Sequence, residues 1–210
     1  MLQRHLTIAV LSTIAALHAQ QPSEEALKKL AAHVDHALGL HPGMIVADIG
    51  TGAAVQQPIR IAGEVAPGGK VICVEVSQSY IDKIKARIDA EHVANMAVQL
   101  GKEDDPLLAP GTFDAVLISN AYHEFTQPEA ILKHIRDALK PEGTLVVVEN
   151  YALANQSVSR ANQVKRHDLE PRILERELVE AGFTVQQRVD PILADSPERS
   201  RYLVRAGKTK

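Results

Sequence analysis

The segment that decides the fold of this chain is Val46-Ala47-Asp48-Ile49-Gly50-Thr51-Gly52-Ala53-Ala54. Its apolar start is typical of a buried strand, and the acid and two glycines that follow are typical of a tight turn into a helix beside a bound nucleotide. Glycines suit such a turn because they adopt backbone angles denied to residues with a Cβ and let a ligand approach the main chain. We therefore expect a strand, a turn and a helix arranged around a nucleotide-like ligand.

Length and composition fit one α/β domain. The chain has 210 residues, of which 45% are hydrophobic and 23% charged, as in ordinary globular proteins. The formal net charge is -3, and no stretch concentrates Lys and Arg, so we expect no nucleic-acid partner. The single cysteine, Cys73, excludes an intrachain disulfide, and its apolar neighbours predict that it packs in the core.

The first 19 residues differ from the rest of the chain. Arg4 and His5 precede an apolar run from Leu6 to Leu17, which ends at Ala19 and a polar stretch. This run of about 12 residues is shorter than the roughly 20 needed to cross a bilayer, so no stable membrane span is expected. It fits a secretory signal cleaved after Ala19, which would export the protein to a bacterial periplasm or out of the cell. The alternative is an N-terminal extension of a cytoplasmic protein, and in both cases residues 20–210 form a single domain.

Strand and helix signals alternate along the rest of the chain, which predicts a doubly wound, mostly parallel sheet with helices on both faces. Two C-terminal strands are expected to form an antiparallel edge, and the polar segment 150–167 is predicted to be a lid or substrate loop. Ser23 and Ser77 are expected to cap helices, and Thr126 with Glu129 to form a capping box. The expected strands are 44–48, 70–75, 96–100, 113–118, 144–148, 183–189 and 202–205, and the expected helices begin at 23, 53, 77, 126 and 171.

Open α/β sheets bind ligands beyond the carboxyl ends of their strands, where the strand order reverses. Glu75 ends the second strand, where an acid can accept both ribose hydroxyls of a nucleoside. The turn lacks the third glycine of a dinucleotide fingerprint, and no Tyr and Lys lie four residues apart, so a nicotinamide-dependent oxidoreductase is a remote alternative. Asp48 would repel a pyrophosphate but suits a ligand with an ammonium group.

Four segments, in this order, resemble the successive motifs of class I S-adenosylmethionine-dependent methyltransferases: 46–52, 71–75, 113–117 and 139–145. The likeness covers about residues 40–150, and the nearest subgroup is small bacterial methyltransferases with a Tyr-His-Glu or Tyr-His-His segment after the fourth strand. The resemblance implies a Rossmann-like methyltransferase fold with S-adenosylmethionine as cofactor. It implies that Asp48, Gly50, Thr51 and Gly52 hold the methionine part, that Glu75 binds the ribose, that Glu103 and Asp104 lie near the adenine, and that Asn120 lines the cofactor.

His123 is the candidate catalytic base. Its side chain titrates near neutrality, and it follows the fourth strand into the expected pocket. A base is needed only if the acceptor must lose a proton, and the alternative is that His123 packs against the next helix. We interpret Tyr122 and Phe125 as packing residues, and Glu124 as a solvated acid rather than as the partner that orients His123.

No metal site is predicted, because His33, His36 and His41 lack an accompanying carboxylate or cysteine pattern and are interpreted as solvated. The predicted function is S-adenosylmethionine-dependent methyl transfer to an unidentified small-molecule acceptor. The alternative is a non-catalytic nucleoside-binding or interaction protein on the same scaffold. Export would favour that alternative, since the cofactor is expected in the cytosol. The sequence makes no prediction about the oligomeric state.

Overall fold

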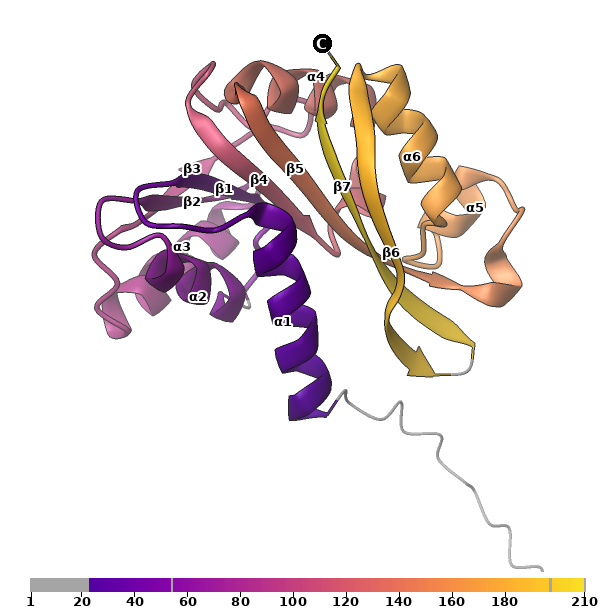
Figure 1. Ribbon diagram of the computed structural model, residues 1–210, viewed down its shortest axis with the longest axis horizontal. Helices are drawn as coiled ribbons and strands as arrows, with labels where there is room; N and C mark the ends of the chain where they lie inside the picture. The colour runs from indigo at the N-terminus through magenta and orange to yellow at the C-terminus, as the bar shows by residue number, and fades with distance from the viewer. Residues whose placement is uncertain (1–22, 54, 197, 210) are drawn as a thin grey trace, which may run out of the picture.

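The computed structural model describes residues 23–53, 55–196 and 198–209, and all seven described strands belong to one sheet in the order β3-β2-β1-β4-β5-β7-β6 (Figure 1). The predicted export signal at residues 1–19 lies outside the described residues. Within the described ranges, no helix is long and apolar enough to cross a membrane. The strands are β1 (Ile45–Ile49), β2 (Lys70–Glu75), β3 (Met96–Leu100), β4 (Phe113–Ser119), β5 (Leu139–Ala152), β6 (Phe183–Ser196) and β7 (Arg199–Lys208). The α-helices are α1 (Glu24–Leu38), α2 (Gln56–Glu64), α3 (Gln78–Ala90), α4 (Pro128–Ala138), α5 (Arg160–Val164) and α6 (Pro171–Glu180), with short 3-10 turns η1 (Tyr122–Glu124) and η2 (Leu153–Asn155).

The sheet confirms the predicted architecture. Strands β1 to β5 pair in parallel, whereas β7 runs antiparallel to both β5 and β6. The chain builds outward from β1 through β2 to β3 and then returns to place β4 on the other side of β1. The strand order therefore reverses between β1 and β4, and a ligand site is expected beyond the carboxyl ends of these two strands.

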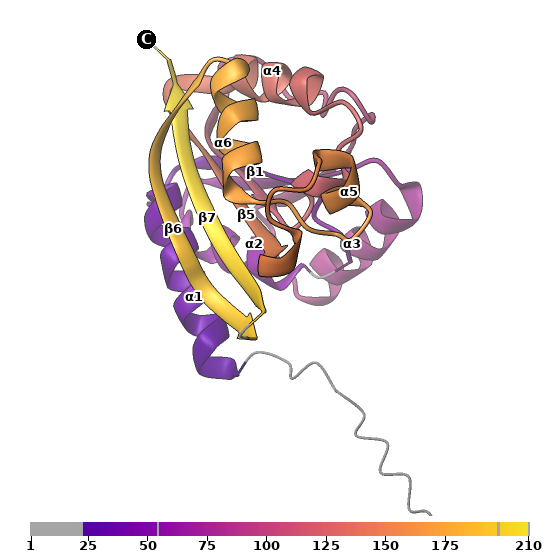
Figure 2. The same ribbon diagram turned by 90° about the vertical axis from the view of Figure 1, so that its right-hand side faces the viewer.

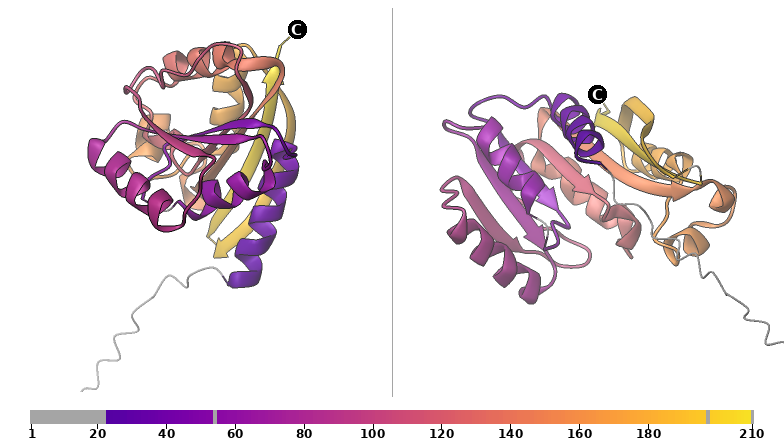
Figure 3. Two further views of the ribbon diagram at one scale, coloured as in Figure 1. Left: turned by 90° about the vertical axis from the view of Figure 1, so that its left-hand side faces the viewer. Right: turned by 90° about the horizontal axis from the view of Figure 1, so that it is seen from below.

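Helices cover both faces of the sheet. Helices α1, α2 and α3 pack with one hydrophobic cluster, and α4 and α6 pack with the other (Figures 2 and 3). Neighbouring residues of one strand face opposite clusters, as Val46 and Ala47 do on β1. Burial on both faces explains the continuous apolar runs of the parallel strands. Cys73 is fully buried in the α1–α3 cluster, as predicted.

The start of α1 follows the sequence prediction, because the Ser23 hydroxyl oxygen accepts a hydrogen bond from the Ala26 N–H at 3.2 Å. Ser77 is the residue before α3, but its side chain makes no capping hydrogen bond. Helix α2 begins three residues later than expected, at Gln56.

The predicted capping box at the start of α4 is wrong. The residue before this helix is Gln127 rather than Thr126, and no side chain caps it. Pro128 occupies the first helical position, where its fixed φ favours the helix and its missing N–H needs no partner. Proline therefore sets the start of α4 in place of the side-chain pair.

Strand β5 is longer than the predicted 144–148. Leu139 already pairs with Phe113 of β4, and the far end continues to Ala152 because β7 pairs with it from Thr144 onward. The two C-terminal strands are extended by the same antiparallel pairing.

The segment predicted as a loop at 150–167 is largely ordered, which corrects the sequence interpretation. It contains the end of β5, the 3-10 turn η2 and helix α5, and buried polar side chains anchor it. The Asp168 carboxylate accepts hydrogen bonds from Asn155 and, at 2.8 Å, from Arg199. The Gln163 side chain accepts from the Glu170 N–H at 2.7 Å. These hydrogen bonds involve polar side chains and leave no hydrophobic periodicity in the sequence, so the sequence pattern did not reveal them.

Candidate functional site

A cavity of about 400 Å³ lies at the carboxyl ends of β1, β2 and β4, where the strand order reverses. Its wall is mostly apolar, with Ile49, Val76 and Ile131 among the contributing side chains. Such a volume and lining are typical of small-molecule sites. Five of the residues predicted to bind the cofactor line it: Gly50, Gly52, Glu75, Glu103 and Asn120.

Gly50 closes the turn after β1 against the segment that follows β4. Its φ is +73°, and a Cβ at this position would stand 2.5 Å from the Cβ of Ala121. Both the backbone angle and the contact exclude a larger residue. The close approach brings the ends of β1 and β4 together as two walls of the same cavity.

Glu75 stands at the end of β2 and faces this turn. Its Oε1 accepts a hydrogen bond from the Gly52 N–H at 2.5 Å, and its Oε2 accepts one from the Val76 N–H at 3.2 Å. A carboxylate has about four acceptor positions, so each oxygen retains one for another donor. Two hydroxyls on adjacent carbons of a ribose match this arrangement.

The other three predicted cofactor residues, Asp48, Thr51 and Asp104, do not line the cavity. Asp48 is buried beneath the turn, and the Thr51 hydroxyl donates to the Asp48 carbonyl oxygen at 2.9 Å. Burial raises the pKa of the Asp48 carboxyl to about 6, a hydrogen bond from Thr51 opposes this, and the charge of Glu75 adds to it. Direct contact of these three side chains with a cofactor stays a prediction.

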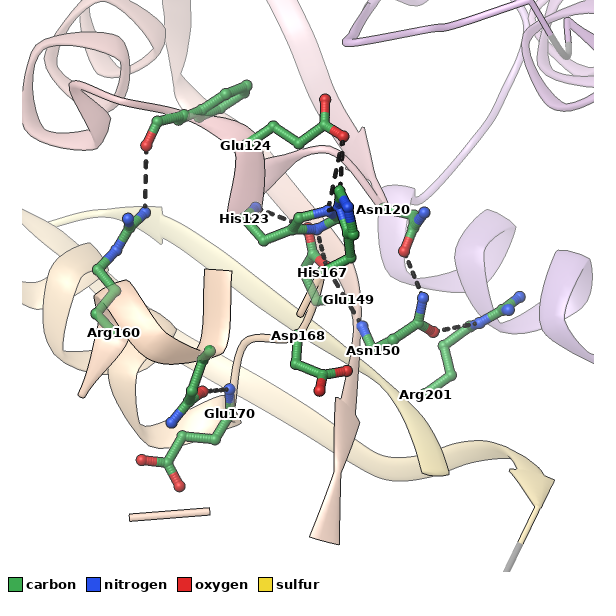
Figure 4. A network of polar contacts seen from close by, with 12 residues as sticks. Asn120, His123, Glu124, Glu149, Asn150, Arg160, His167, Asp168, Glu170 and Arg201 are labelled. Atoms are coloured by element: carbon green, nitrogen blue, oxygen red, sulfur yellow. Dashed lines mark hydrogen bonds and ion pairs between the residues drawn. The ribbon is translucent and has the colours of Figure 1, made fainter. Parts of the chain in front are cut away.

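Asn120 is fixed at the cavity by residues that the sequence did not single out. Its φ is +53°, and its N–H donates to the Val148 carbonyl oxygen at 2.7 Å. Its side-chain oxygen accepts from Asn150, whose own side-chain oxygen accepts from Arg201 at 2.9 Å (Figure 4). This line of contacts joins β4, β5 and β7 at the cavity.

His123 is buried behind the cavity wall and is oriented by Glu149 of β5 (Figure 4). The two side chains are 2% and 0% exposed, and His123 Nδ1 lies 2.9 Å from Glu149 Oε2. The His123 main-chain N–H also donates to Glu149 Oε1 at 3.1 Å. Burial alone lowers the pKa of His123, but the hydrogen bond and charge of Glu149, with the charges of Glu124 and Asp168, raise it above its ordinary value.

The other ring nitrogen of His123 faces two exposed side chains. His123 Nε2 lies 3.3 Å from His167 Nδ1 and 3.8 Å from Glu124 Oε1. Glu124 Oε1 lies 3.9 Å from His167 Nδ1, so the three atoms form a compact triangle. In the part of the chain that the structure describes, these three side chains stand close enough to share one metal ion. We refer to His123, Glu124 and His167 as the histidine cluster.

The sequence gives only partial signs of the two side chains that contact the ring of His123, Glu149 and His167. Glu149 follows the apolar run 145–148, as Glu75 follows the run 71–74, so the rule used for Glu75 would have marked it. His167 resembles the tail of the methyltransferase subgroup, but its sequence position gives no sign that it lies beside His123. Glu124 is exposed, as expected, and it lines the cavity.

Tyr122 is a packing residue, as predicted. It is fully buried, and its hydroxyl donates to Glu177 Oε2 at 2.9 Å. Phe125 packs against it with ring centroids 5.4 Å apart, and in addition lines the cavity. His33, His36 and His41 are exposed.

Comparison with known proteins agrees with this geometry. A family profile described as a methyltransferase domain matches residues 47–145, from β1 into β5. The matched residues form a methyltransferase domain, and this match supports placing the chain among the class I S-adenosylmethionine-dependent methyltransferases. The cofactor of this family is S-adenosylmethionine. Glu149 and His167 lie beyond the matched residues.

Relatives and solved structures of similar fold include other methyltransferases. Protein-L-isoaspartate O-methyltransferase 2 of Rhodopseudomonas palustris is 29% identical over 154 residues, which cover 72% of this chain and 63% of that protein. Demethylmenaquinone methyltransferase of Symbiobacterium thermophilum is 29% identical over 109 residues, which cover 51% of this chain and 43% of that protein. The chain thus spans less than two thirds of either relative. A crystal structure of a SAM-dependent methyltransferase from Aquifex aeolicus shares the fold, with a TM-score of 0.72, 20% identity and coverage of 89% of this chain and 98% of that one.

The cavity fits the cofactor of this family. The remaining acceptor positions of Glu75 suit a ribose, and the apolar wall suits the flat adenine base. Gly52 leaves the main chain open to close approach, since a Cβ at this position would point into open space. The cofactor would supply an activated methyl group on a sulfonium, and the chain would bind and orient it.

Proposed function

We propose that the chain transfers the methyl group of S-adenosylmethionine to a small-molecule acceptor. The observation that carries this proposal is the cavity at the β1–β4 reversal, with Glu75 keeping two acceptor positions toward it. A ligand with two neighbouring hydroxyls and a flat base satisfies both the polar and the apolar parts of its wall.

The cavity, rather than the names of the relatives, favours a small acceptor. One relative is named for demethylmenaquinone and another for an isoaspartyl group of proteins, so the names of the relatives support both a small and a large acceptor. The cavity of about 400 Å³ reaches Glu124, Phe125 and Thr126, beyond the end of β4. An acceptor held there stands inside the same cavity as the cofactor, and such positioning supplies much of the rate of a displacement reaction.

His123 is the residue that we propose acts on the acceptor. Glu149 accepts from Nδ1–H, which fixes the tautomer and leaves the lone pair of Nε2 facing Glu124. Nε2 is therefore the atom of His123 that can take a proton from an acceptor beside the cavity. Glu149 is a positioning residue, since it acts through His123.

Binding and transfer are tested separately. The full chain is titrated calorimetrically with S-adenosylmethionine and with its demethylated product, and transfer is followed with a labelled methyl group over a panel of phenols, carboxylic acids, quinols and amines. We expect binding of both nucleosides and labelling of at least one acceptor class. Absence of binding at millimolar ligand overturns the cofactor assignment. Binding without labelling of any class supports instead a non-catalytic nucleoside-binding protein on this scaffold.

We also propose that residues 1–19 are an export signal, as their sequence pattern indicates. Export would separate the chain from cytosolic S-adenosylmethionine and would therefore favour the non-catalytic alternative over methyl transfer. The proposal is tested by the intact mass of the protein recovered from its native host. A chain that begins after Ala19 and is found outside the cytoplasm supports export. A full-length chain in the cytoplasm refutes it.

A further inference from the structure

The histidine cluster contains the ligand types and the spacing of a metal site. Its three atoms, His123 Nε2, Glu124 Oε1 and His167 Nδ1, are separated by 3.3, 3.8 and 3.9 Å. Two ligand atoms, each about 2.0 to 2.1 Å from a zinc ion and at the tetrahedral angle, lie about 3.3 Å apart. The two histidines already stand at this spacing, and the exposed Glu124 side chain needs only a small rotation to reach it.

The buried histidine has the support that metal-binding histidines have. A ligating imidazole commonly donates its other N–H to a carboxylate, which fixes the ring and makes the ligating nitrogen more basic. Glu149 gives His123 this support at 2.9 Å, and its second oxygen accepts the His123 main-chain N–H. Glu149 is fully buried, so the orientation of His123 is set by the core and not by the surface.

His167 is held beside His123 by its neighbours. Its φ is +54°, a backbone conformation that non-glycine residues rarely adopt and that costs free energy to maintain. The next residue, Asp168, is 1% exposed and accepts from Asn155 and Arg199. The polar anchor of the 150–167 segment therefore fixes an exposed histidine in a strained conformation, next to a buried one.

We propose that His123, Glu124 and His167 bind one divalent first-row transition-metal ion. Two imidazoles and one carboxylate suit zinc and its neighbours in the first row, whereas magnesium and calcium prefer oxygen ligands. Three protein ligands leave at least one position open, as in catalytic sites rather than structural ones. The sequence did not predict this site, because His167 lies 44 residues from His123 in the chain.

The ion would stand at the edge of the cofactor cavity, since Glu124 belongs to both. If the proposed methyl transfer is correct, the bound ion occupies the Nε2 lone pair of His123 and acts on the acceptor in its place, so the open position favours acceptors that carry a metal-binding oxygen. That extension depends on the proposed function. Metal binding itself does not, and is tested without any assay of activity.

The untagged full chain is freed of metal with a chelator and titrated with Zn²⁺ by calorimetry and with Co²⁺ by visible absorption. We expect one ion per chain at the cluster and the absorption bands of a cobalt ion with nitrogen and oxygen ligands. His167→Gln should weaken binding at least tenfold, and this exposed residue can be replaced without disturbing the core. Glu149→Gln keeps all three ligands and should weaken binding by about 10- to 100-fold.

The control is a chain with both His33→Gln and His36→Gln, which removes two exposed histidines of α1 and should leave cluster binding unchanged. Zn²⁺ binding that His167→Gln does not alter, or no binding up to millimolar metal, overturns the proposal and leaves an ordinary hydrogen bond between two histidines. S-adenosylmethionine affinity is measured on the same His167→Gln protein. If His167→Gln still binds S-adenosylmethionine but no longer binds metal, the metal site is supported. If the natural chain binds S-adenosylmethionine but no metal, the metal site is refuted and the proposed function is not.

Discussion

Gly50 and Ala121 lie in direct contact in the wall of the cavity, since a Cβ on Gly50 would stand 2.5 Å from the Cβ of Ala121. The first residue follows β1 and the second follows β4, so this contact fixes the distance between the two strand ends that frame the cavity. The residue sizes allowed at the two positions are therefore linked.

Gly50→Ala is expected to destabilise the protein by about 1 to 3 kcal/mol, from the clash and from the positive φ. It should also weaken cofactor binding, because the displaced residues line the cavity. Adding Ala121→Gly to the same chain should recover the stability that is lost to the clash, but not the stability that is lost to the positive φ. Urea unfolding and calorimetric titration of the three proteins check this, and a double variant no better than Gly50→Ala would contradict the contact.

Glu75→Gln is expected to weaken binding of S-adenosylmethionine by about 1 to 3 kcal/mol, because one acceptor becomes a donor facing a ribose hydroxyl. Calorimetric titration measures the change. Glu64→Gln, an exposed residue of α2 outside the cavity wall, is the matched control and should bind as the natural chain does. Equal affinity of Glu75→Gln and the control would mean that Glu75 does not hold the ribose.

Asp48→Asn is expected to stabilise the protein at neutral pH. Burial raises the pKa of this acid from 3.8 to about 6, so the folded chain keeps a proton that the unfolded chain has already released between these values. The natural chain therefore loses stability as pH rises through this window, by on the order of 3 kcal/mol once pH exceeds 6. The asparagine variant does not titrate, so its advantage should be smallest near pH 4 and largest above pH 6.

Urea unfolding of both proteins across this pH range tests the Asp48 prediction. An advantage that does not change with pH would show that the carboxyl does not titrate in this window. If Asp48→Asn also weakens S-adenosylmethionine binding, the natural residue is kept for the ligand despite its cost to folding.

Asp168→Asn is expected to destabilise the segment that carries His167, because it removes the charge facing Arg199 and alters the contact with Asn155. Loss of these buried hydrogen bonds should cost about 1 to 3 kcal/mol. Amide hydrogen exchange of residues 153–169 should accelerate while that of β1 and β2 does not. Asp137→Asn, at an exposed position of α4, is the control, and equal exchange in the two variants would contradict the anchoring role.

The sequence predicted the sheet well because the inner parallel strands are buried on both faces and so form apolar runs, as at Val71-Ile72-Cys73-Val74. It failed at the start of α4, where proline rather than a side-chain pair sets the boundary. The sequence also predicted a β5 that was too short, because hydrogen bonds to β7 and not apolar packing hold its polar end at Asn150 in the sheet.

The position of these residues at the cavity was predictable because strand ends fall at known places in this fold, which located Gly50, Glu75 and Asn120, while their contact with a cofactor stays a prediction. The His123 partners were not. Glu149 lies 26 residues from His123 and His167 lies 44 residues from it, and they meet only because β5 pairs with β4 and because Asp168 anchors the following segment. Contacts that depend on tertiary pairing leave no local pattern in the chain.

The antiparallel pairing of β5 with β7 has a consequence for how such proteins diverge. The cavity is built by residues inside the common domain, 47–145, whereas Glu149 and His167 belong to the C-terminal part that β7 holds in place. A descendant that inherited the domain with a different C-terminal part would keep the nucleoside site and lose the histidine cluster. Exchange or drift of this part is therefore a route by which related chains can acquire new chemistry without rebuilding the site of their shared cofactor.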